Sequence, residues 1–367
     1  MVCAKSISIR CGVPCGKVHY NAQASLSVSG ARNAPAQVYL CKYLMFKAFF
    51  TNQKWLLWAW GGLVLLLLSI YAQVEITVMI NSWYRDFYNI LQEATKHPVS
   101  KFWDGIETFL YLAMPYVVIV SATNWFGRVW IFRWREAITF NYLPRWQKVE
   151  HEIEGASQRI QEDTHRLAKI LESLGMQVVK AVMLVIAFIP ILWELSKDVS
   201  IEPFASIDGS LVWLAIAVSI GGIVISWFVG WFLPGLEYNN QKVEAAFRKE
   251  LVFAEDDKVN YAKTETVVEL FTGLRFNYQR LFNHYGYFDL WSNSLGQFMV
   301  VAPYLVMGPS LFTGAIMLGV MAQVSNAFQK VYQSFNVVME NWTVITELRS
   351  IWKRLREFET NLEEQVK

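Results

Sequence analysis

Cysteine and charge are scarce in most of this chain. All four cysteines (Cys3, Cys11, Cys15 and Cys41) lie within the first 44 of its 367 residues. The remainder therefore has no disulfide framework and no cysteine-based metal site, and no second ligand pair follows Cys11 and Cys15 at zinc spacing. Charged residues make up 17% of the chain, against roughly 25% in soluble domains. This composition argues against an ordinary soluble domain.

Motifs of soluble enzymes are also missing. The sequence has no HExxH, no GxSxG and no GxxxxGK[ST] phosphate loop, and the nearest approach to the last, Gly12 to Lys17, is one residue short. The chain ends about 20 residues after Leu348, where a fused nucleotide-binding domain is expected to begin. We therefore expect no ATP hydrolysis, no other enzymatic activity, no bound metal and no cofactor.

Long apolar segments are what the chain has instead. Apolar residues reach 54% and aromatic residues 15%, and a membrane helix needs roughly 20 mostly apolar residues. The sequence predicts an all-α polytopic membrane protein with about six transmembrane helices, the sixth of mixed polarity. The expected spans are 55–80, 106–128, 174–195, 210–233, 287–311 and 313–338.

Lysine and arginine indicate the orientation, because they accumulate on the cytoplasmic side of membranes. They are frequent in the connections 128–173 and 234–286, before the first span and after the last, whereas the third connection has only Lys197. Both termini are therefore expected in the cytoplasm. The two basic connections contain few helix breakers, so they predict long cytoplasmic helices joined by short outer loops, as in an exporter-type transport domain. Pro234–Gly235 should bend the chain where the fourth span leaves the membrane.

Carboxylates are the first candidates for chemistry. Glu75 lies deep in the first span, where an ionisable residue is a functional candidate; the alternative is a glutamate satisfied by an Asn or Trp partner. Glu237, Glu244 and Glu255 are 7 and 11 residues apart and so share one helical face. Along a cavity such a row could relay protons, because clustered carboxylates raise one another's pKa. On a hydrated helix it would be a solvated face, and both readings stay open.

The stretch from Gln158 to Arg166 contains opposite charges at helical spacing. Arg159 can pair with Asp163, and Glu162 with Arg166, each one turn apart. Taken by themselves, these residues favour a salt-bridged cytoplasmic helix.

The sixth span carries a stripe of polar residues that cannot face lipid. We expect it to line a substrate path, with neighbouring side chains offering hydrogen bonds and stacking to a peptide; a seam between helices or subunits is the alternative. The stripe comprises Gln323, Asn326, Lys330, Gln333, Asn336 and Glu340, flanked by Gln329, Tyr332 and Phe335.

At the outer end of the first span, Trp83 and Tyr84 are typical of an interfacial aromatic belt, and a substrate-entry contact is the second possibility.

Five sequence runs resemble the SbmA/BacA family of bacterial inner-membrane peptide importers, over residues 54 to 359. They are NSWYRDFYNILQ (81–92), IFRWREAI (131–138), IEGASQRIQEDT (153–164), LPGLEYNNQKVEAAFRKELVFAEDD (233–257) and ITELRSIWKRLREFE (345–359). The QRIQED stretch also resembles a segment of the membrane domains of peroxisomal-type fatty-acyl ABC transporters.

The resemblance implies a multi-pass protein of the bacterial inner membrane, a helix-swapped homodimer with the ABC-exporter-type transmembrane fold and no nucleotide-binding domain. It implies proton-driven import of antimicrobial, proline-rich and peptide-like compounds. The expected partners are peptide, protons, membrane lipid and a second copy of the chain, and no nucleic acid. The family's proton-coupling glutamates correspond here to Glu75, Glu162, Glu237, Glu244 and Glu255, which raises Glu162 above a purely structural role.

The resemblance also suggests a division of the chain. Residues 1–44 match nothing in the family and are expected to be an unstructured extension, with Met45 as the better natural start. Residues 45–348 are expected to form the transport domain, and 349–367 a cytoplasmic helix or tail. Family members usually carry a further membrane helix and an outer-side segment after a start like MFKAFF (45–50), and this chain lacks them.

Two other functions compete with peptide import. The chain could be the membrane subunit of an ABC transporter for acyl chains or cobalamin, energised by a separate ATPase. It could also be a non-transporting scaffold that maintains the cell envelope.

Overall fold

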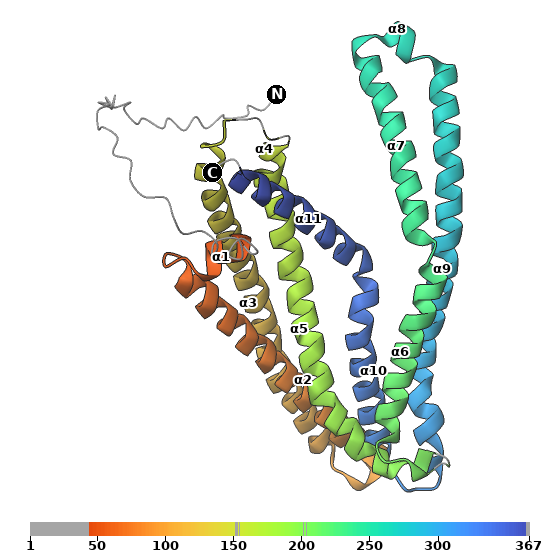
Figure 1. The fold of residues 1–367 in the computed structure, drawn as a ribbon. Coiled ribbons are helices and arrows are strands. Elements are labelled where there is room, and N and C mark those ends of the chain that lie inside the picture. The colour runs from red at the N-terminus through yellow and green to blue at the C-terminus, as the bar shows by residue number, and fades with distance from the viewer. Residues whose placement is uncertain (1–43, 151–152, 154, 201, 203, 365–367) are drawn as a thin grey trace, which may run out of the picture. The chain divides into compact units, whose positions relative to one another are not determined.

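The computed structural model describes residues 44–364 except 151, 152, 154, 201 and 203. This part of the chain contains only helices and the turns between them (Figure 1). The expected all-α architecture is therefore confirmed. The extension proposed for residues 1–44 lies outside the described residues, except for Leu44.

The helices follow one another with short connections. In chain order they are α1 (Leu44–Phe50), the π-helix η2 (Leu57–Gly61), α2 (Gly62–Gln92), η3 (Ala94–Lys96), α3 (Val99–Trp146), α4 (Ala156–Gln158), the π-helix η4 (Arg159–Asp163), α5 (Thr164–Leu195), η5 (Ser196–Asp198), η6 (Phe204–Ser206), α6 (Ser210–Gly230), α7 (Leu233–Asp256), α8 (Lys258–Tyr261), α9 (Thr264–Phe312), α10 (Leu318–Glu340) and α11 (Trp342–Glu364).

Five helical segments of the described chain are long and apolar enough to cross a membrane. They cover the first five expected spans, except that the first segment begins at Leu57, two residues later than expected. The sixth expected span is also helical, but α10 begins only at Leu318, after a turn in which Gly314 adopts φ 76°. Its polar stripe lowers its hydropathy, so α10 is not among the five. The five segments are Leu57–Gln92, Val99–Trp146, Ala156–Asp198, Ser210–Asp256 and Thr264–Phe312.

Two helices are much longer than a bilayer requires. With 48 residues in α3 and 49 in α9, each is about 70 Å long at 1.5 Å per residue, more than twice the roughly 30 Å hydrocarbon core. The predicted extensions beyond the membrane are therefore present. Helix α7 runs alongside the first part of α9, and the short helix α8 connects the end of α7 to the start of α9 (Figure 1). The expected bend lies just before Pro234, at the break between α6 and α7.

One buried apolar cluster joins α1, α3, the start of α5 and α11. Phe49, Trp134 and Tyr142 lie at its centre. Helix α11 contributes a stripe with helical spacing, so it is amphipathic and docked rather than a free tail. The domain boundary expected after residue 348 lies inside this helix. The α11 stripe consists of Ile351, Leu355, Phe358 and Leu362, each at most 2% exposed.

A second cluster joins the far half of α5 to α6, α9 and α10, with Phe188, Leu211, Met299 and Phe328 fully buried. Together the two clusters hold α5 at both ends. They leave α7 and the part of α9 beside it outside either cluster.

The N-terminal end of α10 is attached to α2. Asn89 Oδ1 accepts a hydrogen bond from the Gly319 amide at 2.9 Å, and Gln92 Oε1 accepts one from the Leu318 amide at 2.6 Å. These two side chains satisfy amides that have no partner within the first turn of α10. A Cβ on Gly319 would overlap the carbonyl oxygen of Arg85. Only glycine allows the two backbones to approach so closely.

Candidate functional site

The ion pairs expected between residues 158 and 166 are present. Arg159 Nη1 lies 2.8 Å from Asp163 Oδ2, and Arg166 Nη2 lies 2.7 Å from Glu162 Oε1. Residues 159–163 form the π-helix η4, and single π-turns within helices are frequent at functional sites. The local pairing predicted from the sequence is thus confirmed in a backbone form that the sequence did not predict.

Helix α11 also contacts the residues of these ion pairs. Arg354 donates to both carboxylate oxygens of Asp163, at 2.7 and 3.1 Å, and Asp163 is only 1% exposed. Arg166 also reaches Glu347 of α11 at 3.2 Å. The stretch is therefore an attachment point for α11. The solvated salt-bridged helix favoured from the sequence describes its exposed pair, Glu162 and Arg166, and the buried Asp163 does not fit it.

Two of the three glutamates in the predicted row lie toward α9. Glu244 accepts a hydrogen bond from the Tyr278 hydroxyl at 2.9 Å. One carboxylate oxygen of Glu237 is buried without a hydrogen-bond partner among the described residues, and Glu237 lies near Tyr285. Glu255 is exposed. The structure therefore brings Glu237 and Glu244 against the neighbouring helix and leaves Glu255 in contact with solvent.

Glu75 lies within α2, half-buried. Its carboxylate interacts with the hydroxyl of Tyr71, one turn earlier on the same helix. The sequence analysis considered an Asn or Trp as the partner of Glu75, whereas its partner in the structure is a tyrosine. Both Tyr71 and Glu75 belong to the segment Leu57–Gln92, which is apolar enough to cross a membrane.

The polar stripe of α10 divides into two parts. Near its start, Asn326 donates to Asn81 of α2 at 2.9 Å, and Gln323 is 5% exposed. This part is a seam between helices, the alternative considered from the sequence. Further along, Tyr332 and Gln329 are half-buried and Gln333 is exposed, so the second part remains available to a substrate.

Trp83 packs between α2 and α3. Its indole N–H donates to the carbonyl of Gly105 at 2.8 Å, and its ring stacks on Phe87 with centroids 4.7 Å apart. The neighbouring Tyr84 is half-buried and lies against the edge of Trp83. Trp83 also contacts Phe109 of α3, so it has a packing role here.

A cluster of polar side chains connects three of the apolar helices. The Lys180 ammonium of α5 donates to Gln73 Oε1 of α2 at 3.0 Å and to the Tyr116 hydroxyl of α3 at 3.2 Å. Gln73 in turn donates to Thr123 of α3 at 3.1 Å and is 4% exposed. A lysine at this depth is costly and is retained where it has polar partners.

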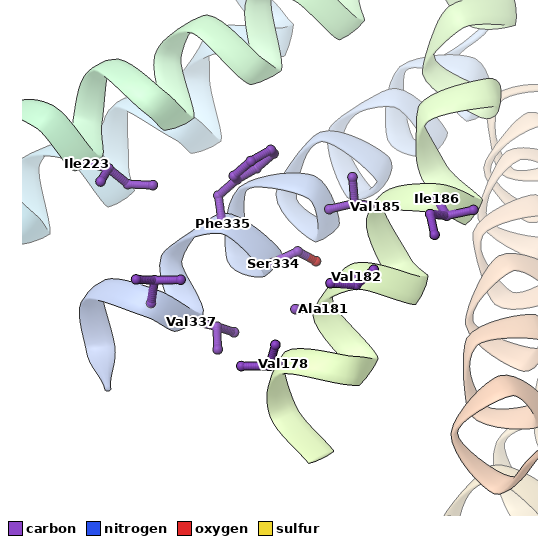
Figure 2. A pocket seen from close by; sticks show the side chains of 10 residues that line it. Val178, Ala181, Val182, Val185, Ile186, Ile223, Ser334, Phe335 and Val337 are labelled. Carbon is purple, nitrogen blue, oxygen red and sulfur yellow. The ribbon is translucent and has the colours of Figure 1, made fainter. Parts of the chain in front are cut away.

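An apolar cleft of about 340 Å³ lies between α5, α6 and α10. Figure 2 shows Ser334 and Phe335 of α10 on one side and the valines of α5 on the other, with Ile223 of α6 across from them. Phe335, expected from the sequence to offer stacking beside the substrate path, lines it, and Gln333 directly precedes Ser334. The cleft is lined by Val178, Ala181, Val182, Val185, Ile186, Ile223, Ser334, Phe335, Val337 and Val338.

A metal centre has no support in the described part of the chain, where no three His, Cys, Asp or Glu side chains are grouped as a metal ion requires.

Comparison with known proteins places the chain in a family. Residues 52–363 match the sequence model of the SbmA/BacA-like family. The chain belongs to the SbmA/BacA-like family. The resemblance based on the sequence runs is thus confirmed, and with five apolar helices the protein is a multi-pass membrane transporter.

Several named relatives of this SbmA/BacA-like protein are ABC transporters. It is 28% identical to the inner membrane ABC transporter ATP-binding protein YddA of Escherichia coli K12, over 81% of this chain and 56% of that protein. It is 24% identical to ABC transporter D family member 2, chloroplastic, of Arabidopsis thaliana, over 80% and 42% of the two chains. The chain spans about half the length of the relatives it matches.

Sequence reasoning missed two features of this SbmA/BacA-like transporter. Lys180 lies in the expected span 174–195, so the rule that singled out Glu75 also identifies it. The attachment of α11 through Asp163 and Arg354 had no such signal, because 191 positions separate the two residues.

Proposed function

We propose that this transporter imports peptides across the bacterial inner membrane, as a homodimer driven by the proton gradient. Membership of the SbmA/BacA-like family supports transport in general, and the family resemblance supplies peptides as the substrate class. Antimicrobial, proline-rich and peptide-like compounds are the specific candidates. In this proposal both termini of the chain are cytoplasmic.

The placement of Glu237 carries the proton-coupling part of the proposal. One oxygen of its carboxylate is buried and has no hydrogen-bond donor among the described residues. That oxygen is free to form a hydrogen bond with a bound proton, water or a substrate donor. Seven residues later, Glu244 faces the same neighbouring helix and accepts a hydrogen bond from Tyr278. Two carboxylates on one face of α7 thus offer successive positions for a proton.

The apolar cleft supports the substrate class. Its lining carries no charged side chain and only Ser334 is polar, so it suits apolar side chains such as proline. The neighbouring Tyr332 and Gln333 can offer stacking and hydrogen bonds to a peptide backbone. We propose that this part of α10 contacts the peptide and that Gln323 and Asn326 support the helix seam.

The experiment is uptake of a fluorescent proline-rich peptide into proteoliposomes that contain the full chain and no ATP. We expect uptake only when an acidic exterior is imposed, and loss of uptake when a protonophore is added. Empty liposomes and liposomes without a pH gradient are the controls. Uptake that is the same with and without the gradient would show that protons do not drive it.

A second candidate is the membrane part of an ABC transporter with a separate ATPase. The names of the relatives, which include ATP-binding proteins, favour it. In cells, this candidate predicts uptake that survives a protonophore and stops when ATP is depleted. Absence of uptake for several peptide classes, relative to an empty-vector control, would instead favour a non-transporting envelope scaffold.

A further inference from the structure

Basic side chains from two helices converge where α3 packs against the first part of α5. These helices lie side by side (Figure 1). From α3, Arg135 Nη1 lies 3.4 Å from the ring of His165, and its Nη2 donates to the Gln161 carbonyl at 3.2 Å. Lys169, one turn after His165 on α5, lies close enough for its charge to act on the same ring. Arg135, His165 and Lys169 therefore form one group.

Arg128 extends this group along the helix pair. It precedes Arg135 by seven residues, so the two side chains share one face of α3 and lie about 10 Å apart along its axis. The carboxylate of Glu172 on α5 lies near both Arg128 and Lys169. Arg128 and Glu172 therefore mark one level of the helix pair, and Arg135 and His165 mark the other. The four basic residues are called the basic surface below.

The cations of the basic surface form no ion pair among the described residues. No carboxylate in that part of the chain lies within ion-pair distance of Arg128, Arg135 or Lys169. By contrast, Arg133 on α3 is paired with Glu136 at 2.9 Å. Three positive charges are thus gathered between α3 and α5 without an ion-pair partner.

Glu172 offsets only part of this charge. It is half-buried, and a Cβ added to Gly127 of α3 would lie 3.6 Å from its Oε1. The carboxylate therefore lies against the α3 backbone, at the Arg128 end of the basic surface. One negative charge against three positive charges leaves the surface positive. Like charges repel one another, and a bound anion removes that repulsion.

The level of the basic surface along the helices matches the headgroup layer of a bilayer. The expected spans end at residue 128 on α3 and begin at residue 174 on α5, so Arg128 and Glu172 lie at the edge of the hydrocarbon core. The headgroup layer on each side of that core is about 5–8 Å thick. This thickness is close to the ~10 Å that separate Arg128 from Arg135 along α3.

Exposed aromatic rings accompany the arginines on this face of α3. Trp125 is 66% exposed and Phe132 is 59% exposed. Together with Arg128 and Arg135 they follow the three- and four-residue spacing of one helical face. Exposing rings of this size to water is unfavourable, and tryptophan is enriched where a helix meets the bilayer interface. A phospholipid offers acyl chains to the rings and a phosphate to the arginines, so the face is complementary to a phospholipid.

We propose that the basic surface binds the headgroup of an anionic phospholipid, with Arg128, Arg135 and Lys169 contacting its phosphate. Contacts of this kind are charge-assisted hydrogen bonds. The acyl chains then lie along the apolar part of α3 that precedes Arg128. The bound lipid neutralises the gathered charges and so holds α3 and α5 together at this level. This inference goes beyond the proposed function, and only the assignment to the cytoplasmic leaflet rests on the orientation proposed above.

Native mass spectrometry of the full chain in detergent tests the proposal, because it counts bound lipids without any transport. The probes are phosphatidylglycerol and phosphatidylcholine with identical acyl chains, and inorganic phosphate as a competitor. We expect phosphatidylglycerol to bind at least about fivefold more tightly than phosphatidylcholine, and phosphate not to displace it. Equal binding of the two lipids would overturn the proposal. Displacement by phosphate would show a site for small anions and would overturn it as well.

Substitutions determine where the lipid binds. Arg128→Gln and Lys169→Gln should each weaken phosphatidylglycerol binding about fivefold, as about 1 kcal/mol per basic residue at an anionic surface implies, and leave phosphatidylcholine binding unchanged. Both side chains are exposed, so we expect normal folding, which the melting temperature in detergent without added lipid checks. Lys169→Arg keeps the charge and should bind as the wild type does.

The matched control is Lys353→Gln, because Lys353 is a basic residue of α11 outside the basic surface and is 79% exposed. This variant should bind phosphatidylglycerol as tightly as the wild type. An equal loss of binding in Lys353→Gln would mean that net charge alone attracts the lipid, and it would overturn the proposal. Unchanged binding in both Arg128→Gln and Lys169→Gln would overturn it too.

Discussion

The carboxylate of Asp163 binds the guanidinium of Arg354 through two hydrogen bonds across 191 positions of sequence. Both oxygens of Asp163 are used, at 2.7 Å by Nη2 and at 3.1 Å by Nε, and the side chain is 1% exposed. This contact joins the π-helix η4 to the C-terminal helix α11. It makes α11 a part of the transport unit.

Replacing Arg354 with Met should destabilise the protein strongly. The substitution leaves the buried charge of Asp163 with Arg159 alone, and breaking a buried pair costs about 3 kcal/mol or more. Thermal unfolding of the purified protein in detergent measures the loss. Lys353→Met is the matched control, because Lys353 is 79% exposed and its nearest acidic partner is 3.9 Å away. Equal melting temperatures for the two variants would contradict this assignment.

Glu359→Gln should change the pH dependence of stability. Burial raises the pKa of Glu359 above its ordinary value, against the lowering effect of hydrogen bonds from the Tyr142 hydroxyl and the Met45 amide. The folded state therefore binds this proton more readily than the unfolded state does. The stability that the proton contributes is present below the unfolded pKa and is lost as the pH rises through the folded pKa.

The glutamine variant keeps an acceptor oxygen for both donors and carries no charge. We expect it to melt at or above the wild-type temperature at about pH 8, with the difference shrinking toward about pH 4. Melting curves across this range measure the effect. Glu357→Gln, at a position 63% exposed, should show no such trend. A difference that is independent of pH would mean that the charge of Glu359 is not the cause.

Lys180→Met should impair transport more than it impairs folding. The substitution keeps the length of the side chain and removes the donor to Gln73 and Tyr116. Losing these hydrogen bonds should cost about 1–3 kcal/mol and loosen α2, α3 and α5 from one another. We expect peptide uptake to fall about tenfold at similar protein abundance. Lys197→Met is the control, since Lys197 is 65% exposed and its ion pair, with Glu194, is also exposed.

Gly319→Ala should destabilise the α2–α10 seam. The added Cβ would overlap the carbonyl oxygen of Arg85, and backbone atoms cannot move aside as a flexible side chain can. We expect a loss of about 1–3 kcal/mol and lower abundance in the membrane. Gly308→Ala in α9 has open space around it and should be neutral or stabilising by up to about 1 kcal/mol. Similar effects of the two variants would argue against the close approach.

Glu244→Gln tests the carboxylates of α7. Glutamine keeps the shape and the acceptor for Tyr278 but cannot exchange a proton, so we expect uptake to fall at least about tenfold with normal abundance. Glu269→Gln, at an exposed position on α9, should leave uptake unchanged. Normal transport by the Glu244→Gln variant would show that Glu244 is a structural residue.

The sequence by itself determined the membrane character and most of the helices. Apolar runs such as 210–233 predict spans because the bilayer excludes unpaired backbone groups, and the pairs Arg159–Asp163 and Glu162–Arg166 follow from helical spacing alone. The family also follows from contiguous runs. These are local properties, so one stretch of sequence contains all the information that they need.

Only the tertiary structure decided which polar groups meet. Asp163 and Arg354, Glu244 and Tyr278, and Lys180 and Gln73 are joined by the packing of different helices, and spacing along one helix cannot show such contacts. The same holds for Asn326, for which the sequence left both a substrate path and a helix seam open, and whose amide donates to Asn81 of α2. A polar face on one helix is compatible with water, substrate or a neighbouring helix, and only the position of that neighbour decides between them.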